Sequence, residues 1–206
     1  MPSDLFLTVI QLAALVFSIV VHEVAHGYAA WRLGDPTARM SNRLTLNPLK
    51  HIDPIGSVVL PLLLVLTHSK ILFGWAKPVP FNPAYFRDPR KGIMIVGAAG
   101  PLANFILAVA SALLFRPVGH FVPLAGWFLA YLCITNVFLG VFNLIPIPPL
   151  DGSRIVMGVL PDRLLRAYMQ VERFGIIIVF VLVYGGLLDR VINPVASLLL
   201  RFFQGE

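Results

Sequence analysis

The chain has 206 residues, of which 58% are hydrophobic and 13% charged, and its mean hydropathy is +0.84. This composition excludes an ordinary soluble protein and is typical of a protein with several membrane spans. The net charge of +6 does not indicate nucleic-acid binding, because the lysines and arginines lie in short segments between apolar runs and form no basic block with interleaved aromatic residues.

The first predicted span covers about residues 5–30 and contains the motif H-E-x-x-H at residues 22–26. In a helix, His22 and His26 share one face, and two imidazoles at this spacing can bind one Zn²⁺ while Glu23 takes a proton from a water molecule. A carboxylate within an apolar helix costs roughly 2.5–3.5 kcal/mol. A functional role is therefore favoured over a helix end whose His and Glu side chains reach the lipid headgroups. No Lys or Arg precedes this run, so we expect a retained span rather than a cleaved signal peptide.

The segment after the first span is polar and broken, and it encloses one short apolar run. Residues 40–48 partly alternate between apolar and polar side chains, which predicts a short strand or hairpin. Residues 55–67 are apolar, but the run is short and contains a glycine and a proline, so we expect residues 55–73 to form a re-entrant or interfacial segment. Residues 74–83 are too rich in proline for a helix and are predicted to be extended and strand-like. His51 is expected to be a loop or interface residue rather than a metal ligand.

Two further apolar runs, at about residues 93–115 and 124–146, are predicted spans. The first contains Gly100 and Asn104 on one helix face. Asn104 needs a hydrogen-bonding partner in the membrane, so we expect it to face the protein interior, either in helix packing or in a site. The second contains the single cysteine, which cannot form an internal disulfide. A proline-rich stretch then leads to Asp151, either a turn residue or a metal ligand.

The C-terminal part of the chain begins with a polar, arginine-containing segment. Residues 172–188 are a fourth predicted span. Residues 191–203 are expected to lie at the interface or to extend back into the bilayer. Together these segments predict an all-α polytopic membrane protein, with one membrane-embedded domain over residues 1–206 and small β-strand or re-entrant insertions on the cytoplasmic side.

The side of the membrane that each loop occupies decides whether Asp151 can join the two histidines. If residues 55–73 are re-entrant, Asp151 returns to the side where the first span ends; if they cross the bilayer, it lies on the opposite side. Residues 31–54, 70–92 and 147–173 carry four, five and four of the 16 lysines and arginines. The re-entrant topology places all of these on one side, which the positive-inside rule makes cytoplasmic. We therefore expect the site to lie toward the cytoplasm.

Three motifs, in this order and approximate spacing, resemble the site-2 protease family of intramembrane zinc metalloproteases, and the resemblance covers most of the chain. The motifs are H-E-x-x-H at residues 22–26, Gly100-x-x-x-Asn104, and N-L-I-P through L-D-G at residues 143–152. The resemblance implies a site-2-protease-type helical core. It also implies that His22, His26 and Asp151 are zinc ligands and that Glu23 is the catalytic acid/base. Asn143 then corresponds to an asparagine that handles the substrate. The resemblance further implies a short prokaryotic-type member with no PDZ or CBS domain.

The sequence thus predicts an intramembrane zinc metalloendopeptidase with one Zn²⁺ per chain, in the cell membrane, acting on transmembrane protein substrates in the lipid bilayer. Asn143 or Asn104 is expected to donate a hydrogen bond to the substrate backbone or to the oxyanion. The alternative is a zinc-binding membrane transporter without proteolytic activity, because intramembrane His and Asp also line ion pathways. In that alternative Glu23 has no required role.

Overall fold

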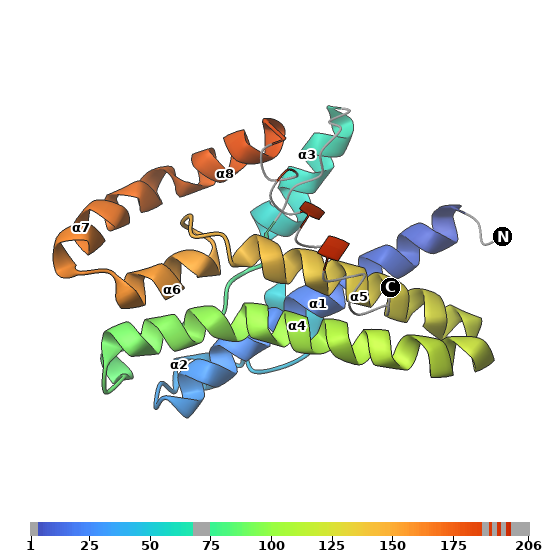
Figure 1. Cartoon of the computed structure of the whole chain (residues 1–206), viewed down its shortest axis with the longest axis horizontal. Helices are drawn as coiled ribbons and strands as arrows, with labels where there is room; N and C mark the ends of the chain where they lie inside the picture. Colours follow the sequence, from blue (N-terminus) through green and yellow to red (C-terminus); the bar gives the residue numbers. More distant parts are fainter. Residues whose placement is uncertain (1–3, 68–74, 187–189, 191–192, 195–196, 199–206) are drawn as a thin grey trace.

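The computed structural model describes residues 4–67, 75–186, 190, 193–194 and 197–198 (Figure 1). Within these residues every regular element is helical and no strand is found. The α-helices are α1 (Asp4–Arg32), α2 (Thr37–Met40), α3 (Leu60–Leu66), α4 (Pro89–Phe121), α5 (Pro123–Asn143), α6 (Asp151–Val159), α7 (Asp162–Val171) and α8 (Gly175–Tyr184). Shorter helical turns are η1 (Pro48–His51), η2 (Pro54–Val59), η3 (Pro83–Tyr85) and η4 (Glu172–Phe174).

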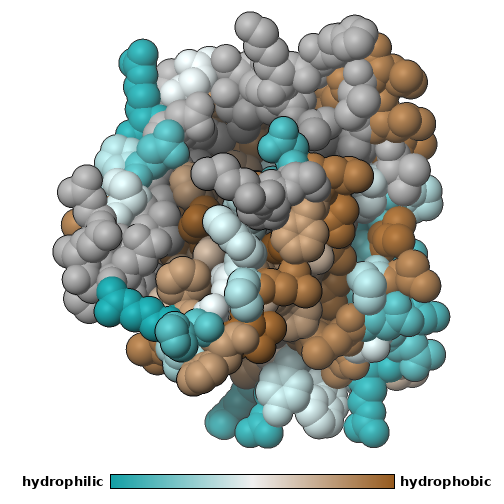
Figure 2. Space-filling view, turned by 90° about the vertical axis from the view of Figure 1, so that its right-hand side faces the viewer, coloured by the Kyte–Doolittle hydropathy of each residue, from teal (hydrophilic) through white to brown (hydrophobic). Residues whose placement is uncertain are grey.

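Helices α1, α4 and α5 are long and apolar enough to cross a membrane, with 29, 33 and 21 residues and hydropathy of 2.3, 2.1 and 1.8. They correspond to the three expected spans at about residues 5–30, 93–115 and 124–146, and they make this a multi-pass membrane protein. The three helices pack against one another, and Figure 2 shows a brown apolar surface on one face with hydrophilic side chains along its lower and right-hand margins. One core cluster lies between α4 and α5, around Ala108 and Val137.

The direction of the three spans follows from their contacts. His22 and His26 on α1 meet Asn104 and Val96 on α4, in reverse order, so α1 and α4 are antiparallel. Helix α5 returns beside α4 in the opposite direction (Figure 1). The end of α1, the start of α4 and the end of α5 therefore lie at one end of the bundle. The whole connection between α1 and α4 leaves and rejoins the bundle at that end.

That connection differs from the sequence prediction in two places, because neither residues 40–48 nor the described residues 75–83 form a strand. The strand or hairpin expected over residues 40–48 is not formed, because Ser41 and Arg43 donate their backbone N–H groups to Thr37 and Ala38 in local turns. Asn42 also adopts a left-handed φ of 53°, which a strand does not allow. The alternation of apolar and polar residues therefore did not indicate a β-strand, because a strand also requires a partner strand to which it can hydrogen-bond.

The short apolar run is helical throughout its described part, through η2 and then α3. At 1.5 Å per residue it spans about 20 Å, less than the roughly 30 Å of a hydrocarbon core. Residues 68–74 lie outside the described residues, so a re-entrant path over 55–73 stays a prediction. The fourth expected span, residues 172–188, contains the ten-residue helix α8. Its end, and much of residues 191–203, also lie outside the described part of the chain.

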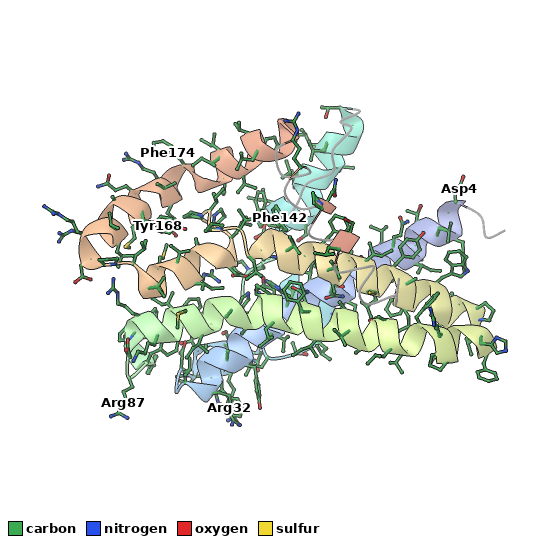
Figure 3. The ribbon with its side chains drawn as sticks, in the orientation of Figure 1. Asp4, Arg32, Arg87, Phe142, Tyr168 and Phe174 are labelled. Atoms are coloured by element: carbon green, nitrogen blue, oxygen red, sulfur yellow. The ribbon has the colours of Figure 1, made fainter. Side chains whose placement is uncertain are left out.

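Helices α6, α7 and α8 fold back beside the end of α5 (Figure 1). The hydroxyl of Tyr168 on α7 donates to the carbonyl of Pro146, 2.8 Å away, and so ties α7 to the proline-rich stretch after α5 (Figure 3). Arg90 in the first turn of α4 pairs with Asp162 at 3.1 Å and donates to the carbonyl of Leu160 at 2.7 Å. These contacts place the start of α6, which is Asp151, against the middle of the bundle.

Candidate metal centre

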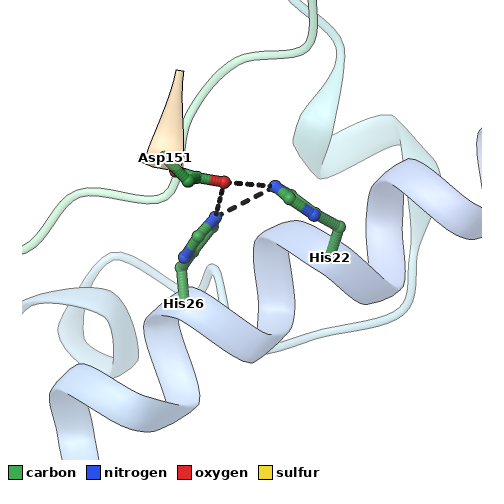
Figure 4. A group of neighbouring side chains, drawn as sticks. All are labelled: His22, His26 and Asp151. Atoms are coloured by element: carbon green, nitrogen blue, oxygen red, sulfur yellow. Dashed lines mark hydrogen bonds and ion pairs between the residues drawn. The ribbon is translucent and has the colours of Figure 1, made fainter. Parts of the chain in front are cut away.

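The two histidines of H-E-x-x-H and Asp151 meet at one point inside the bundle (Figure 4). His22 Nε2 and His26 Nε2 are 3.0 Å apart, and Asp151 Oδ2 lies 3.0 Å from the first and 3.1 Å from the second. The three residues are 7%, 4% and 5% exposed. Helical spacing supplies the two imidazoles, and the return of the chain to the same end of the bundle supplies the carboxylate.

The outer nitrogen of each imidazole fixes which nitrogen carries the proton. His26 Nδ1 lies 2.6 Å from the carbonyl oxygen of Val96, which only accepts, so Nδ1 donates. His22 Nδ1 lies 2.6 Å from the amide oxygen Oδ1 of Asn104 and donates in the same way. In its neutral form each imidazole therefore directs the lone pair of Nε2 toward Asp151. Three acceptor atoms then converge with no donor between them, which is the arrangement that a cation stabilises.

The donor set fits zinc. Two imidazole nitrogens and one carboxylate oxygen are a usual catalytic zinc set, which leaves a fourth position open. Zinc bonds of about 2.0–2.2 Å place tetrahedral ligands roughly 3.3–3.6 Å apart. The observed separations of 3.0 and 3.1 Å are a few tenths of an ångström shorter, so only small side-chain adjustments are needed.

Glycine on α4 makes room for the two imidazoles. A Cβ at Gly100 would lie 2.5 Å from His22 Cε1 and 2.5 Å from His26 Nε2. One turn earlier, a Cβ at Gly97 would lie 2.6 Å from Arg154 Cβ, so α6 also packs closely against α4. Gly97 and Gly100 thus border the site itself.

Asp151 uses its two oxygens differently. Oδ2 faces the histidines, whereas Oδ1 accepts from Arg154 Nη1 at 2.9 Å, one turn along α6. The guanidinium of Arg154 favours the charged form of this side chain, so Asp151 faces the histidines as a carboxylate. Arg154 was not identified from the sequence. Its position three residues after Asp151 could have indicated this ion pair, because residues at i and i+3 are neighbours on a helix.

Glu23 is held by an extended segment, residues 75–82, rather than by another helix. Its Oε2 accepts from the backbone N–H of Val79 at 2.9 Å. The buried side chain of Arg43 donates through Nη2 to the carbonyls of Lys77 and Pro78, at 2.5 and 3.2 Å. The segment forms no helix, as expected, but it is not a strand either. Its prolines lack N–H groups, and the N–H groups of Trp75, Lys77 and Val79 bond to Gly56, His51 and Glu23 instead of to a second strand.

A cavity of about 480 Å³ adjoins the metal centre. Its wall includes the three candidate ligands, Glu23, residues 75–79 in part, the end of α5 and one side of α8. Asn143 lines this cavity and donates through Nδ2 to the carbonyl of Leu139 at 3.0 Å. Asn104 does not line it: its side chain is fully buried behind His22. His51 is the buried last residue of the helical turn η1, and its Nε2 donates to the carbonyl of Thr45 at 2.9 Å.

Comparison with known proteins agrees with this geometry. The model of peptidase family M50 matches residues 120–185. YwhC of Bacillus subtilis, named as a candidate zinc metalloprotease, is 37% identical over 191 residues, covering 89% of this chain and 84% of YwhC. Rip2 of Mycolicibacterium smegmatis, named in the same way, is 33% identical over 88% of this chain and 69% of Rip2. The zinc metalloprotease MJ0392 of Methanocaldococcus jannaschii is 28% identical over 100% of this chain and 51% of that protein. No solved structure matches the chain.

Proposed function

The chain belongs to peptidase family M50, the site-2 protease family, and on that premise we propose that it is an intramembrane zinc metalloendopeptidase. Its substrates are membrane proteins, cut in or near their transmembrane segments. The observation that carries the proposal is the convergence of His22, His26 and Asp151 on one point, beside Glu23 and at the wall of one cavity. We assign the first three as ligands of one zinc ion and Glu23 as the catalytic acid/base.

A zinc ion at this point would polarise the scissile carbonyl and make a water molecule more acidic. The chain supplies the proton transfers. Glu23 takes a proton from the attacking water and later gives it to the leaving amine. The N–H of Val79 holds one oxygen of the Glu23 carboxylate, which fixes its position at the cavity wall. Asn143, with one amide hydrogen on Leu139, offers the other hydrogen to the substrate backbone.

We place the site toward the cytoplasm. The three loops that carry most of the lysines and arginines all join the bundle at the end where α1 finishes and α4 begins. The positive-inside rule assigns that end to the cytoplasm, and residues 55–73 then enter and leave the membrane on one side. Substitution of single cysteines at positions 45 and 87 tests this, because both should be labelled only after the cytoplasmic side is opened. Labelling of position 87 alone from outside intact cells would contradict it.

The test of activity is Glu23→Gln. Purified wild-type protein with zinc should cleave members of a panel of unstable single-span peptides. The variant should bind the same one zinc per chain but cleave about 10²–10⁴-fold more slowly, the usual contribution of general acid–base catalysis. Equal cleavage by both would contradict the mechanism. Zinc flux into liposomes that persists in the variant, without peptide cleavage by either protein, would instead support a transporter.

A further inference from the structure

A row of buried polar side chains leads away from the metal centre through all three spanning helices. Asn104 on α4 contacts His22, Asn136 on α5 contacts Asn104, and Ser18 on α1 contacts Asn136. The donor–acceptor distances are 2.6, 2.7 and 2.8 Å. Each of the three side chains is 0% exposed. Polar groups buried among apolar helices are costly unless every bond is made, so this row requires a reason beyond packing.

The row has only one possible direction. Asn136 Nδ2 lies 2.8 Å from the carbonyl of Leu132, and an atom facing a carbonyl must be the amide nitrogen. The other amide atom, Oδ1, therefore faces Asn104 and accepts from Asn104 Nδ2. Asn104 must in turn present its Oδ1 to His22. The far end is also closed, because the Ser18 hydroxyl donates to the carbonyl of Ala14 at 2.7 Å and so accepts from Asn136.

The consequence reaches the ligand atom. With Asn104 Oδ1 toward it, His22 carries its proton on Nδ1 and leaves Nε2 free to bind a metal. If the Asn104 amide turned over, its NH₂ group would face Nδ1 and favour the tautomer with the proton on Nε2, which cannot bind. His26 does not face this choice, because a backbone carbonyl fixes its tautomer.

We propose that Asn136 is a positioning residue for the metal centre, acting through Asn104 to fix the tautomer and ring orientation of His22, with Ser18 holding its far side. Asn136 lies on a different helix from all three candidate ligands, and its side-chain hydrogen bonds go to Asn104, Ser18 and Leu132 rather than to any of them. The inference rests on the proposed metal site. It goes beyond that site by making α5 a contributor to metal affinity.

The test measures zinc affinity on the full-length chain in detergent, by competition with a chelator of known affinity. Co²⁺ is used in parallel, because its visible spectrum reports on the coordinating atoms. Asn136→Leu keeps the branching and the number of heavy side-chain atoms but removes the amide oxygen and nitrogen. We expect zinc affinity to fall about 10- to 100-fold, the usual effect of losing a hydrogen bond that orients a metal ligand, with a changed Co²⁺ spectrum. Wild-type affinity and spectrum in a folded variant would overturn the inference.

A double-variant cycle separates positioning from general packing. Asn104→Leu removes the acceptor for His22 directly and should weaken zinc binding at least as much. Because Asn136 acts through Asn104, the double variant should bind zinc no more weakly than Asn104→Leu alone. If the two losses multiply instead, Asn136 acts independently of Asn104 and the inference is wrong.

Ser111→Ala is the matched control. Ser111 is also buried on α4, but its hydroxyl bonds to Leu107 on its own helix at 2.7 Å. Its zinc affinity should equal that of the wild type. If Asn136→Leu does not fold, Ser18→Ala replaces it, because it removes one oxygen from the same row. A roughly 2- to 5-fold weaker zinc affinity is then expected, below the effect of losing a direct partner, and unchanged affinity would overturn the inference. Failure of the wild type itself to bind zinc would refute the metal site instead.

Discussion

The proposed metal ligands and the proposed acid/base lie side by side, but different kinds of structure hold them. His22 and His26 are fixed between α1 and α4, by an amide and a backbone carbonyl of a packed helix. Glu23, on the same helix as the histidines, is fixed by Val79 in an extended segment that carries no ladder bonds. Helix packing is rigid, whereas a segment of this kind belongs to the less stable part of a protein. Substitutions near the histidines should therefore weaken metal binding, whereas substitutions near Glu23 should slow proton transfer and leave metal binding intact.

The largest effect should come from removing one of the two histidines that are fixed between α1 and α4. His26→Ala removes a ligand and should abolish both stoichiometric zinc binding and cleavage. Chelation of the wild type should give the same loss, reversed by added zinc. Elemental analysis and the peptide-cleavage assay measure the two effects. Residual cleavage by a zinc-free His26→Ala protein would show that the metal centre is not required.

A gentler change near the same two histidines is Gly100→Ala. The new methyl group would overlap both imidazoles, and overpacking costs up to about 3 kcal/mol, which is roughly a 100-fold change in affinity. We expect zinc binding to weaken to about this extent, and cleavage to recover when excess zinc is supplied. Ala99→Gly, a change of similar size one residue away, serves as the comparison. Normal zinc affinity in Gly100→Ala would mean that the site is looser than the structure shows.

The smallest effect should come from a change in the segment of residues 75–82 that holds Glu23. Val79→Pro removes the N–H that Glu23 accepts from, in a stretch whose neighbouring prolines already favour an extended backbone. Cleavage should slow by about 10-fold, less than the full value of a charged hydrogen bond because water in the cavity can replace the lost donor. Zinc affinity should stay unchanged. Val79→Ala keeps the N–H and controls for lost packing; an equal rate loss in both variants would attribute the effect to the side chain.

Sequence patterns predicted the features that depend on local spacing. The H-E-x-x-H motif placed two histidines on one helix face, and charge distribution together with metal geometry brought Asp151 to the same side. The positions of Asn136 and Val79 could not be predicted in this way, because each acts through a partner far away in sequence. The prediction of a strand over residues 40–48 was wrong for a related reason. An alternation of apolar and polar residues describes one segment but does not show whether a partner strand lies beside it.

The ion pair between Arg154 and Asp151 has a consequence for coordination number. Arg154 occupies Oδ1, so the carboxylate offers a cation one oxygen rather than two. A carboxylate that bound through both oxygens would take up a further coordination position, the one that a hydrolytic zinc site must keep open for water and substrate. Arg154 thus leaves Asp151 only one oxygen with which to bind a metal. Arg154 would thereby help to keep open the coordination position that the proposed hydrolysis requires.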